Sequence, residues 1–344
     1  MNNDTNTNLL GKNLKELELL CEKNNFPKFH GMQLFKWLYN KTNITVQDMT
    51  NIPEKLKTVI SKNYNLNSIK TEHKFHSKQD DTIKYLFKTK DNRLIESVSM
   101  VENSRHTLCI SSQIGCSVDC SFCATGKMGI IRNLDAGEII EQIISIKHSR
   151  EKPVTNIVFM GMGEPFLNYN NVIKACEILT DPSGFNLSTK RITISTSGIL
   201  PKIEKYISEK QKYKLAISLN ASNNTMRNQL IPINRKWPIE DILNVIKKYQ
   251  FNKYKPIMFE YVLINGVNDS QNNAKELATL LKGIPCKINI IPYNTINNDY
   301  KRSKNIEIFI DTLNKYKSEF RVLIRKNKGQ DINAACGQLA TVNE

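Results

Sequence analysis

The sequence lacks long apolar runs. No stretch of its 344 residues approaches the roughly 18 consecutive apolar residues that span a bilayer. Residues Met1–Asn8 are polar and contain no apolar core of the kind found in a secretory signal peptide. We therefore expect a cytoplasmic protein with no membrane association. Its eight cysteines should serve metal or thiol chemistry rather than a structural disulfide framework.

Arginine is scarce, whereas lysine is abundant. The chain holds 10 arginines against 39 lysines, and its formal net charge is +16. A charge of this size favours a polyanionic partner such as RNA or DNA. A second interpretation stays open, because the chain is also rich in asparagine and isoleucine. An AT-rich genome produces that composition without any nucleic-acid function.

The chain also lacks a Pro-, Gly- or Ser-rich linker, so its organisation shows only as changes of pattern. Up to about residue 65 the apolar residues follow helical spacing, which predicts a small helical domain over residues 1–68. We expect this basic domain to bind RNA, although a solvated lysine-rich surface is an equally good interpretation. Alternating apolar and polar residues then predict a few antiparallel strands, an extension over residues 69–104 that leads into the core.

The remaining residues, 105–344, alternate strand patterns with helix patterns, which indicates a parallel α/β core. The predicted strands are Thr107–Ser111, Asn156–Met160, Arg191–Ser195, Lys214–Leu219, Ile257–Leu263 and Lys287–Ile291. The predicted helices are Asp135–His148, Asn171–Thr180, Ile239–Tyr249, Ser270–Leu281 and Asn305–Tyr316. Asp135, with Glu138 three residues later, is a typical helix start. The pattern by itself does not separate a barrel from an open sheet.

Three cysteines stand close together between residues 113 and 129, in C-x3-C-x2-C spacing: Cys116, Cys120 and Cys123. Over such short gaps three thiolates can converge on one centre, which suits an iron–sulfur cluster. In a four-iron cluster they would leave one iron free for a substrate, and Phe122 would shield the cluster from water. A zinc site is the alternative, with His106 or Cys109 as its fourth ligand.

This spacing, with an aromatic residue before the third cysteine, resembles the signature of the radical S-adenosylmethionine (SAM) superfamily. The segment Met160–Pro165 follows the second predicted strand and is similar to the Gly-Gly-Glu motif that binds SAM in that superfamily, with Gly163 and Glu164 at matching positions. The resemblance implies one [4Fe-4S] cluster on the three cysteines, with SAM at its free iron. It also implies a partial (β/α)6 barrel whose site lies at the carboxyl ends of the strands.

Small polar residues also stand at or just after the ends of other predicted strands, where they suit a ligand site: Ser195, Ser218, Asn220 and Asn294. Such residues equally suit helix caps, so each of them is a weak signal when taken alone. A lone cysteine is most often a small buried apolar residue, which is our interpretation of Cys21, Cys176 and Cys286. From the residues alone, the roles of Cys109 and Cys336 stay open.

Four separated segments narrow the resemblance to one family. The chain resembles the RlmN family of dual-specificity RNA methyltransferases at Cys109–Cys116, Gly161–Pro165, Ser195–Gly198 and Asp331–Leu339. The similarity extends to residues 29–39 near the N-terminus. Members of this family methylate C2 of an adenine in 23S rRNA and in certain tRNAs. The resemblance therefore implies a methyltransferase with those two RNAs as substrates.

The same resemblance implies a chemical role for three residues. Adenine C2 cannot displace a methyl group from SAM by ordinary nucleophilic attack, so Cys336 first takes a methyl group from one SAM. After a second SAM is cleaved, the carbon on Cys336 is joined to C2, and Glu96 removes the C2 proton. Cys109 then attacks Cys336, which forms a disulfide and releases the methylated RNA. Two SAM molecules are thus consumed in each turnover, and an electron donor such as flavodoxin is needed.

The resemblance also implies which residues contact SAM. They lie near the strand ends: Gly163, Glu164, Ser195, Ser218, Leu219, Asn220 and Asn294. Asn220 departs from the family, in which histidine follows the Ser-Leu pair. Asparagine keeps the capacity to hydrogen-bond but cannot titrate. Nine basic residues between Lys301 and Gln330 support an RNA partner through phosphate contacts. We expect a monomer.

Two alternatives stay open. The Cfr type of methyltransferase shares the cysteine chemistry but modifies C8 of the same rRNA adenine. Pro165, where the Cfr type has alanine, and the similarity of the N-terminal helical segment favour C2. The alternative from a different class is a non-catalytic, zinc-stabilised RNA-binding protein, which leaves Cys109 and Cys336 without a role.

Overall fold

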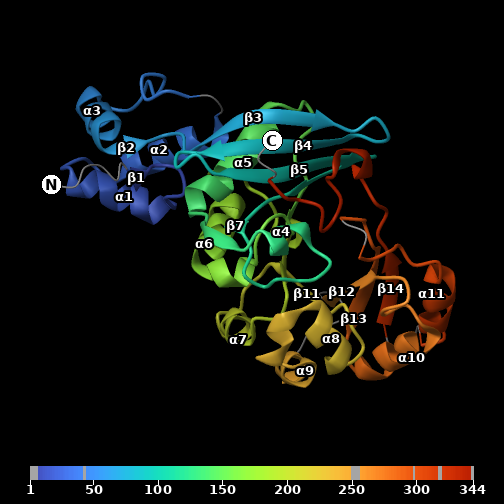
Figure 1. Cartoon of the computed structure of the whole chain (residues 1–344). Helices are drawn as coiled ribbons and strands as arrows, with labels where there is room; N and C mark the ends of the chain where they lie inside the picture. The colour runs from blue at the N-terminus through green and yellow to red at the C-terminus, as the bar shows by residue number, and fades with distance from the viewer. Residues whose placement is uncertain (1–6, 42–43, 249–255, 297–298, 317–319, 342–344) are drawn as a thin grey trace.

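A mixed β-sheet runs through the whole molecule and carries the residues of interest (Figure 1). The computed structural model describes residues 7–41, 44–248, 256–296, 299–316 and 320–341. Within these ranges the sheet has ten strands, and helices surround its parallel half. No helix in the described ranges is long and apolar enough to span a membrane.

The parallel half of the sheet forms an open barrel. Its strands, in the order in which they pair, are β6 (Arg105–Cys109), β9 (Asn156–Phe159), β10 (Ile192–Thr196), β11 (Lys214–Ser218), β12 (Ile257–Leu263), β13 (Cys286–Pro292) and β14 (Phe320–Ile324). The first six confirm the predicted strands and the α/β barrel fold. The seventh, β14, was not predicted, because Arg321 interrupts an apolar run that is only five residues long.

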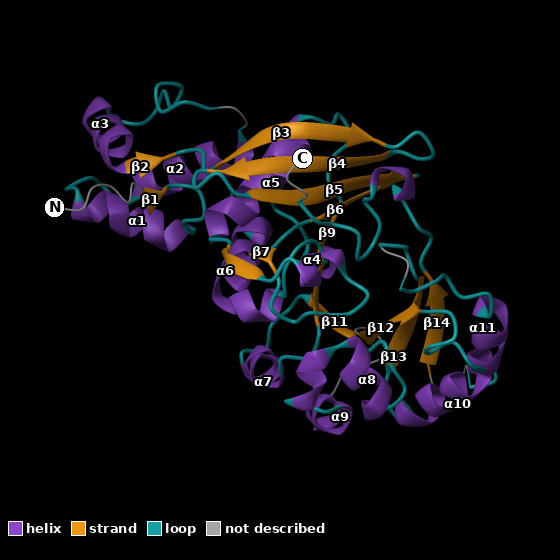
Figure 2. Cartoon of the chain, in the orientation of Figure 1, coloured by secondary structure: helices purple, strands orange, loops and turns teal. Residues whose placement is uncertain are grey.

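Helices connect these strands and lie around the outer side of the barrel (Figure 2). They are α5 (Ala136–His148), α6 (Tyr169–Thr180), α7 (Leu200–Ser208), α8 (Asn224–Leu230), α9 (Ile239–Lys248), α10 (Gln271–Leu280) and α11 (Ile306–Asn314). Single turns of 3-10 helix stand at Pro165–Asn168, Thr189–Arg191, Pro232–Arg235 and Gln330–Ile332. The five predicted helices are confirmed, although Tyr249 lies outside the described residues. The α8 helix was missed because seven residues are too few for a clear helical period, and α7, which begins at Leu200–Pro201, was also missed.

The predicted start of α5 is confirmed in detail. The Asp135 side chain accepts a hydrogen bond from Glu138 N at 2.8 Å, and the Glu138 side chain accepts one from Asp135 N at 3.0 Å. This reciprocal capping satisfies two backbone donors that the first helical turn leaves unpaired. It fixes the first turn of the helix that follows the cysteine segment.

Three helices form the N-terminal part, at one end of the molecule (Figure 1): α1 (Leu14–Lys23), α2 (Phe29–Asn40) and α3 (Glu54–Asn63). A short parallel strand pair, β1 (Thr7–Asn8) and β2 (Tyr64–Asn65), lies beside them. This part packs closely on the core, since a Cβ on Gly11 would overlap the backbone of Gly137 in α5. The helical pattern is confirmed, whereas the division into domains at residues 68 and 104 stays a prediction.

Three antiparallel strands extend the barrel sheet, as the alternating pattern predicts: β3 (Ile69–His76), β4 (Thr82–Thr89) and β5 (Leu94–Glu102). The last of them pairs with β6, which sets Val98 opposite Cys109. Ser97 on β5 donates to Gln142 of α5 at 2.6 Å, so this face of the strand is turned toward the helix. Glu96 and Met100 lie on the opposite face, because side chains alternate along a strand.

After β14 the chain runs back across the open end of the barrel. Near the β3–β4 turn, Asp331 accepts a hydrogen bond from Ser77 Oγ at 2.7 Å. Farther along, Gly337 O accepts one from Ala124 N, in the cysteine segment, at 2.8 Å. This C-terminal segment, residues 325–341, therefore bridges the antiparallel strands and the cysteine segment. It carries Cys336 between them.

Glu141 on α5 joins the N-terminal part to the core. Its Oε2 accepts hydrogen bonds from Ser68 N at 2.5 Å, Ser68 Oγ at 2.5 Å and Ile69 N at 3.0 Å. Burial raises the pKa of Glu141 from 4.5 to about 7, although these donors lower it.

We expect the substitution Glu141→Gln to remove a pH dependence of stability. A carboxyl group whose pKa rises on folding contributes its full stabilisation at a pH below the pKa of the unfolded state. This contribution is lost as the pH rises through the pKa of the folded state. Between pH 4.5 and pH 7 the free energy of unfolding of the unsubstituted protein should fall by about 3 kcal/mol relative to that of the Gln variant. Urea unfolding at several pH values measures this difference. A difference that does not change with pH would contradict the expectation.

Candidate active site

The three clustered cysteines lie in a loop at the carboxyl end of β6. The base of the loop is a strand pair, β7 (Gln113–Gly115) and β8 (Ile130–Asn133), and a short helix, α4 (Ala124–Lys127), lies within it. Gly115 has a φ of +75°, and a Cβ on it would overlap Gly129 O. Cys116 N donates to the same oxygen at 2.8 Å. The loop can therefore close only over a glycine.

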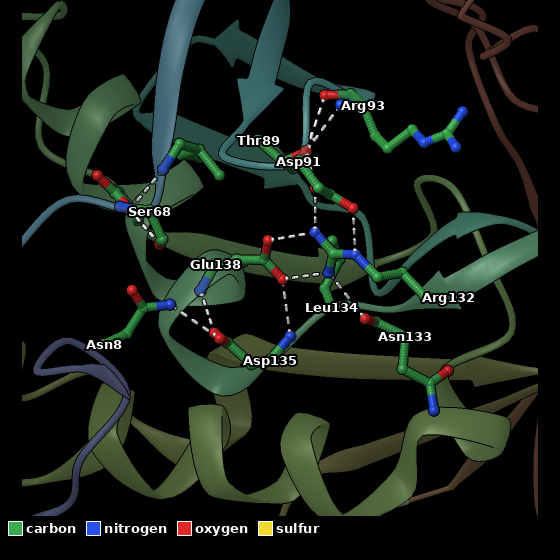
Figure 3. Close-up of polar contacts among 12 residues, drawn as sticks. Asn8, Ser68, Thr89, Asp91, Arg93, Arg132, Asn133, Leu134, Asp135 and Glu138 are labelled. Atoms are coloured by element: carbon green, nitrogen blue, oxygen red, sulfur yellow. Dashed lines mark hydrogen bonds and ion pairs between the residues drawn. The ribbon is translucent and has the colours of Figure 1, made fainter. Parts of the chain in front are cut away.

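Charged side chains hold the base of this loop in place (Figure 3). Arg132 on β8 donates to Asp91 Oδ1 at 2.7 Å, and to both carboxyl oxygens of Glu138 at 2.8 Å. Asp91 belongs to the β4–β5 turn and Glu138 to the first turn of α5. At the start of the same helix, Asp135 Oδ2 accepts a hydrogen bond from Asn8 Nδ2 of the N-terminal part at 2.8 Å. One network thus ties the loop to three other parts of the chain.

All three thiols of the loop line one hollow at the barrel mouth, which we call the first hollow: Cys116, Cys120 and Cys123. Burial raises the pKa of Cys116 to about 12, while the backbone N–H of Val118 lowers it. Burial also raises the pKa of Cys120 well above its ordinary value. Thiols in such surroundings ionise when a metal cation binds them, as expected of a metal–thiolate site.

The donor set fits an iron–sulfur cluster. The thiols are soft donors, and Val118 and Phe122 line the same hollow as apolar cover. In the described ranges, no group of three His, Cys, Asp or Glu side chains is arranged to hold a single metal ion. Each thiolate of a four-iron cluster binds a different iron, so the cysteines of such a site stand farther apart than the ligands of one ion.

The two side chains considered as fourth zinc ligands are not placed for that role. The His106 ring is buried, and its Nδ1 and Nε2 lie 2.8 Å from Lys152 O and Ser99 Oγ. Cys109 is not among the residues that line the first hollow. The geometry therefore favours three protein ligands over a closed four-ligand zinc site.

Polar residues at the strand ends line the rest of the first hollow: Gly163, Glu164, Ser195, Ser218, Asn220 and Asn294. Glu164 is buried, and its two carboxyl oxygens accept from Ser197 N at 2.7 Å and Phe166 N at 2.9 Å. Burial raises the pKa of Glu164, and these donors lower it. Leu219 is the exception among the residues expected to contact SAM. Its side chain is fully buried and does not line the hollow.

A second hollow adjoins the first beneath the C-terminal segment. Cys109 and Cys336, which are far apart in the sequence, both line it. Cys336 and Arg325 line the first hollow as well, so they lie at the boundary between the two. Burial raises the pKa of Cys109 to about 12 and also raises that of Cys336, whereas the Arg325 guanidinium lowers both. Both thiols are free.

Glu96 lies near the second hollow without lining it. It is buried and forms an ion pair with Lys84 at 2.9 Å. Burial raises the pKa of Glu96, and Lys84 lowers it. Met100, on the same face of β5, does line this hollow. The role of Glu96 as a proton acceptor therefore stays a prediction.

Comparison with known proteins gives the same architecture. The model of the radical SAM superfamily matches residues 110–278, and that of the ribosomal RNA large subunit methyltransferase N-terminal domain matches residues 7–66. The chain is 44% identical over 348 residues to the dual-specificity RNA methyltransferase RlmN of Buchnera aphidicola subsp. Schizaphis graminum, an alignment that covers 98% of this chain and 94% of that one. The chain belongs to the RlmN family.

Other relatives agree. A probable dual-specificity RNA methyltransferase RlmN from Clostridium novyi is 41% identical over 335 residues, covering 96% of this chain and 97% of that protein. The crystal structure of a radical SAM methyltransferase from Sphaerobacter thermophilus superposes with a TM-score of 0.90 at 38% identity. It covers 96% of this chain and 98% of that one. Membership of the radical SAM superfamily implies a [4Fe-4S] cluster and SAM.

Asn220, where the resemblance led us to expect histidine, has a structural role in this protein. This residue has a φ of +57°, in the left-handed region that asparagine tolerates better than most side chains. Its Oδ1 accepts a hydrogen bond from Val262 N at 2.8 Å. The asparagine side chain therefore supports the end of the neighbouring strand β12, while Asn220 still lines the first hollow.

Sequence reasoning missed three charged residues in or around the site: Arg227, Glu260 and Arg325. Arg227 is fully buried, and its guanidinium donates to Ser197 O, Leu219 O and Ser218 O. No feature of the short helix α8 indicates from the sequence that Arg227 is buried at the site. Glu260 could have been noticed as the acidic residue in the otherwise apolar strand Ile257–Leu263. Arg325 was counted only as one of several basic residues.

We expect Gly115→Ala to prevent cluster assembly while the barrel still folds. The added methyl group overlaps Gly129 O and must displace the base of the cysteine loop. Iron content after anaerobic reconstitution should fall several-fold, with little change in the circular dichroism spectrum. Gly266→Ala is the matched control, because Gly266 also has a positive φ but a Cβ there meets nothing within 4 Å. Equal iron content in the two variants would contradict the expectation.

Proposed function

We propose that this protein methylates C2 of an adenine in RNA through a methyl group carried on Cys336. The position of Cys336 is the observation that supports this proposal most. Its side chain lines the first hollow, with the cluster cysteines and strand-end residues, and the second hollow, with Cys109. A thiol at this boundary can take a methyl group from SAM on one side and meet an RNA base on the other.

The first hollow would bind the cluster and SAM. Cys116, Cys120 and Cys123 would hold one [4Fe-4S] cluster, which supplies the electron that cleaves SAM. Among the strand-end residues, Glu164 would accept a hydrogen bond from the SAM ammonium group, because it lines the hollow and each of its carboxyl oxygens can accept a second bond. The apolar side chains of Val118 and Phe122 would limit the access of water.

Cys336 would act first as a nucleophile. Its sulfur forms a bond with the methyl carbon of one SAM, the sulfonium C–S bond breaks, and S-adenosylhomocysteine leaves. The thiol proton is lost to solvent, and Arg325 favours the thiolate. A second SAM would be cleaved by that electron, and its deoxyadenosyl fragment would take a hydrogen atom from the methyl group on Cys336 and leave as 5′-deoxyadenosine. The methylene carbon would then bond to C2, and the adduct would return one electron to the cluster as the C2 proton is lost.

Two further residues would complete the reaction. Glu96, whose pKa is raised by burial, accepts the proton from C2. The Cys109 sulfur then attacks the Cys336 sulfur, so that an S–S bond forms and the bond from sulfur to the methylene carbon breaks. The carbon leaves with the electron pair and takes up a proton, which completes the methyl group. A thiol reductant must reopen the disulfide before the next turnover.

The second hollow would receive the target adenine. Lys326 and Lys328 line it beside Arg325, and these cations suit contacts to RNA phosphates. The net charge of +16 supports the same partner. We propose 23S rRNA and tRNA as substrates, flavodoxin or a similar protein as the electron donor, and a cytoplasmic monomer as the working form. The match of residues 7–66 to an rRNA methyltransferase domain model supports C2 over the C8 chemistry of the Cfr type.

We expect Cys109→Ala to trap RNA covalently on Cys336, because the thiol that releases the product is then missing. Anaerobic purification from cells, nuclease digestion and mass spectrometry of the peptide that contains Cys336 measure this adduct. The attached nucleoside identifies the methylated carbon, with C2 expected. Cys176→Ala is the control, since Cys176 is buried in α6 and lines neither hollow.

A cluster-loaded Cys109→Ala protein that carries no RNA would argue against the two-cysteine chemistry. An adduct through adenine C8 would keep that chemistry and overturn the choice of C2. RNA attached to the Cys176→Ala control would show that the trapping does not depend on Cys109.

A further inference from the structure

Glu260 is a buried acidic residue that none of the roles above uses. It lies in β12, and its side chain is only 5% exposed. Alternation along the strand turns Glu260 and Val262 toward the barrel interior, where both line the first hollow. Phe259 and Tyr261, on the other face, belong to the apolar core.

One of its carboxyl oxygens is satisfied and the other is not. Oε2 accepts hydrogen bonds from Ser195 Oγ at 2.8 Å and from Ser218 Oγ at 3.5 Å. Oε1 is buried and has no hydrogen-bond partner in the part of the chain that the structure describes. Leaving a buried acceptor unpaired is unfavourable, because the atom has lost its hydrogen bond to water and gained none in return. An oxygen in this state, on the wall of a hollow, indicates a donor supplied by a ligand.

The position of Glu260 in the sheet decides which donor of SAM it meets. The cysteine loop follows β6 and Glu164 follows β9, whereas Glu260 lies on β12, three strands beyond β9. The amino acid part of SAM belongs on the side of the cysteine loop and Glu164. Glu260 therefore faces the nucleoside part, in which two neighbouring ribose hydroxyls are strong donors. A carboxylate that accepts from ribose hydroxyls is a known way to hold a nucleoside.

We propose that Glu260 is a SAM-binding residue that accepts a hydrogen bond from a ribose hydroxyl through Oε1. Through Oε2 it also orients the Ser195 and Ser218 hydroxyls, which lie 3.3 Å from each other and line the same hollow. The proposal rests on the proposed function only in that SAM occupies the first hollow. It does not depend on the RNA or on the position that is methylated.

Calorimetric titration of the iron-free and the reconstituted protein with S-adenosylhomocysteine and its 2′-deoxy and 3′-deoxy analogues tests the proposal. The unsubstituted protein should bind one of the two analogues about tenfold more weakly than the parent compound. Glu260→Gln should bind the parent compound about tenfold more weakly and should no longer discriminate against that analogue. Glu276→Gln is the matched control. Glu276 also accepts from a serine, Ser222 Oγ at 2.6 Å, but lies outside the hollow.

Two outcomes would overturn the proposal: equal binding of all three compounds by the unsubstituted protein, or a Gln variant that still discriminates. The first needs no variant, so a folding defect in Glu260→Gln cannot hide it. Protein that binds S-adenosylhomocysteine with the expected discrimination but does not methylate RNA would leave Glu260 in its role and refute the proposed function. Protein that does not bind S-adenosylhomocysteine would refute both.

Discussion

The contact between the cysteine loop and the C-terminal segment is the constraint on which the site depends. Ala124 follows the last cysteine of the loop, and its N–H donates to the carbonyl oxygen of Gly337, next to Cys336, at 2.8 Å. Asn294 Nδ2, just after β13, donates to Cys336 O at 3.1 Å. One bond holds the backbone at Cys336 and the other holds it at the next residue, so together they place Cys336 at the boundary of the two hollows. The position of Cys336 therefore depends on contacts among the barrel, the cysteine loop and the C-terminal segment.

Burial and one cation set the electrostatics of this boundary. Burial raises the pKa of Cys109 to about 12, which favours its neutral thiol form. Arg325 lies beside both thiols and lowers the pKa of each, so it opposes the cost of forming a thiolate there. This balance would suit the proposed chemistry, in which the two thiols react at different stages.

The local features of the molecule could be predicted from the sequence, and the long-range ones could not. Inner strands such as β12 can be predicted from a short apolar run. Helices such as α5 can be predicted from their apolar spacing and from the capping residues at their start. The edge strand β14 carries a weaker signal, because its apolar run is short and Arg321 interrupts it. The cysteine spacing is also local, so the cluster ligands could be recognised. Cys109 and Cys336 stand more than two hundred positions apart in the sequence. From the sequence, only the resemblance to a family indicated that they act together, and the fold then showed that they line one hollow. Glu260 and Arg325 became visible only once the strands had been brought together.

The most direct test of this account is to locate the methyl group on the protein itself. The protein would be expressed in cells supplied with methyl-deuterated methionine, purified anaerobically and digested, and every cysteine-containing peptide would be examined by mass spectrometry. The account predicts one labelled methyl group on Cys336 and none on Cys109 or on the other cysteines. A cluster-loaded protein with an unlabelled Cys336, or with the label on Cys109, would contradict it.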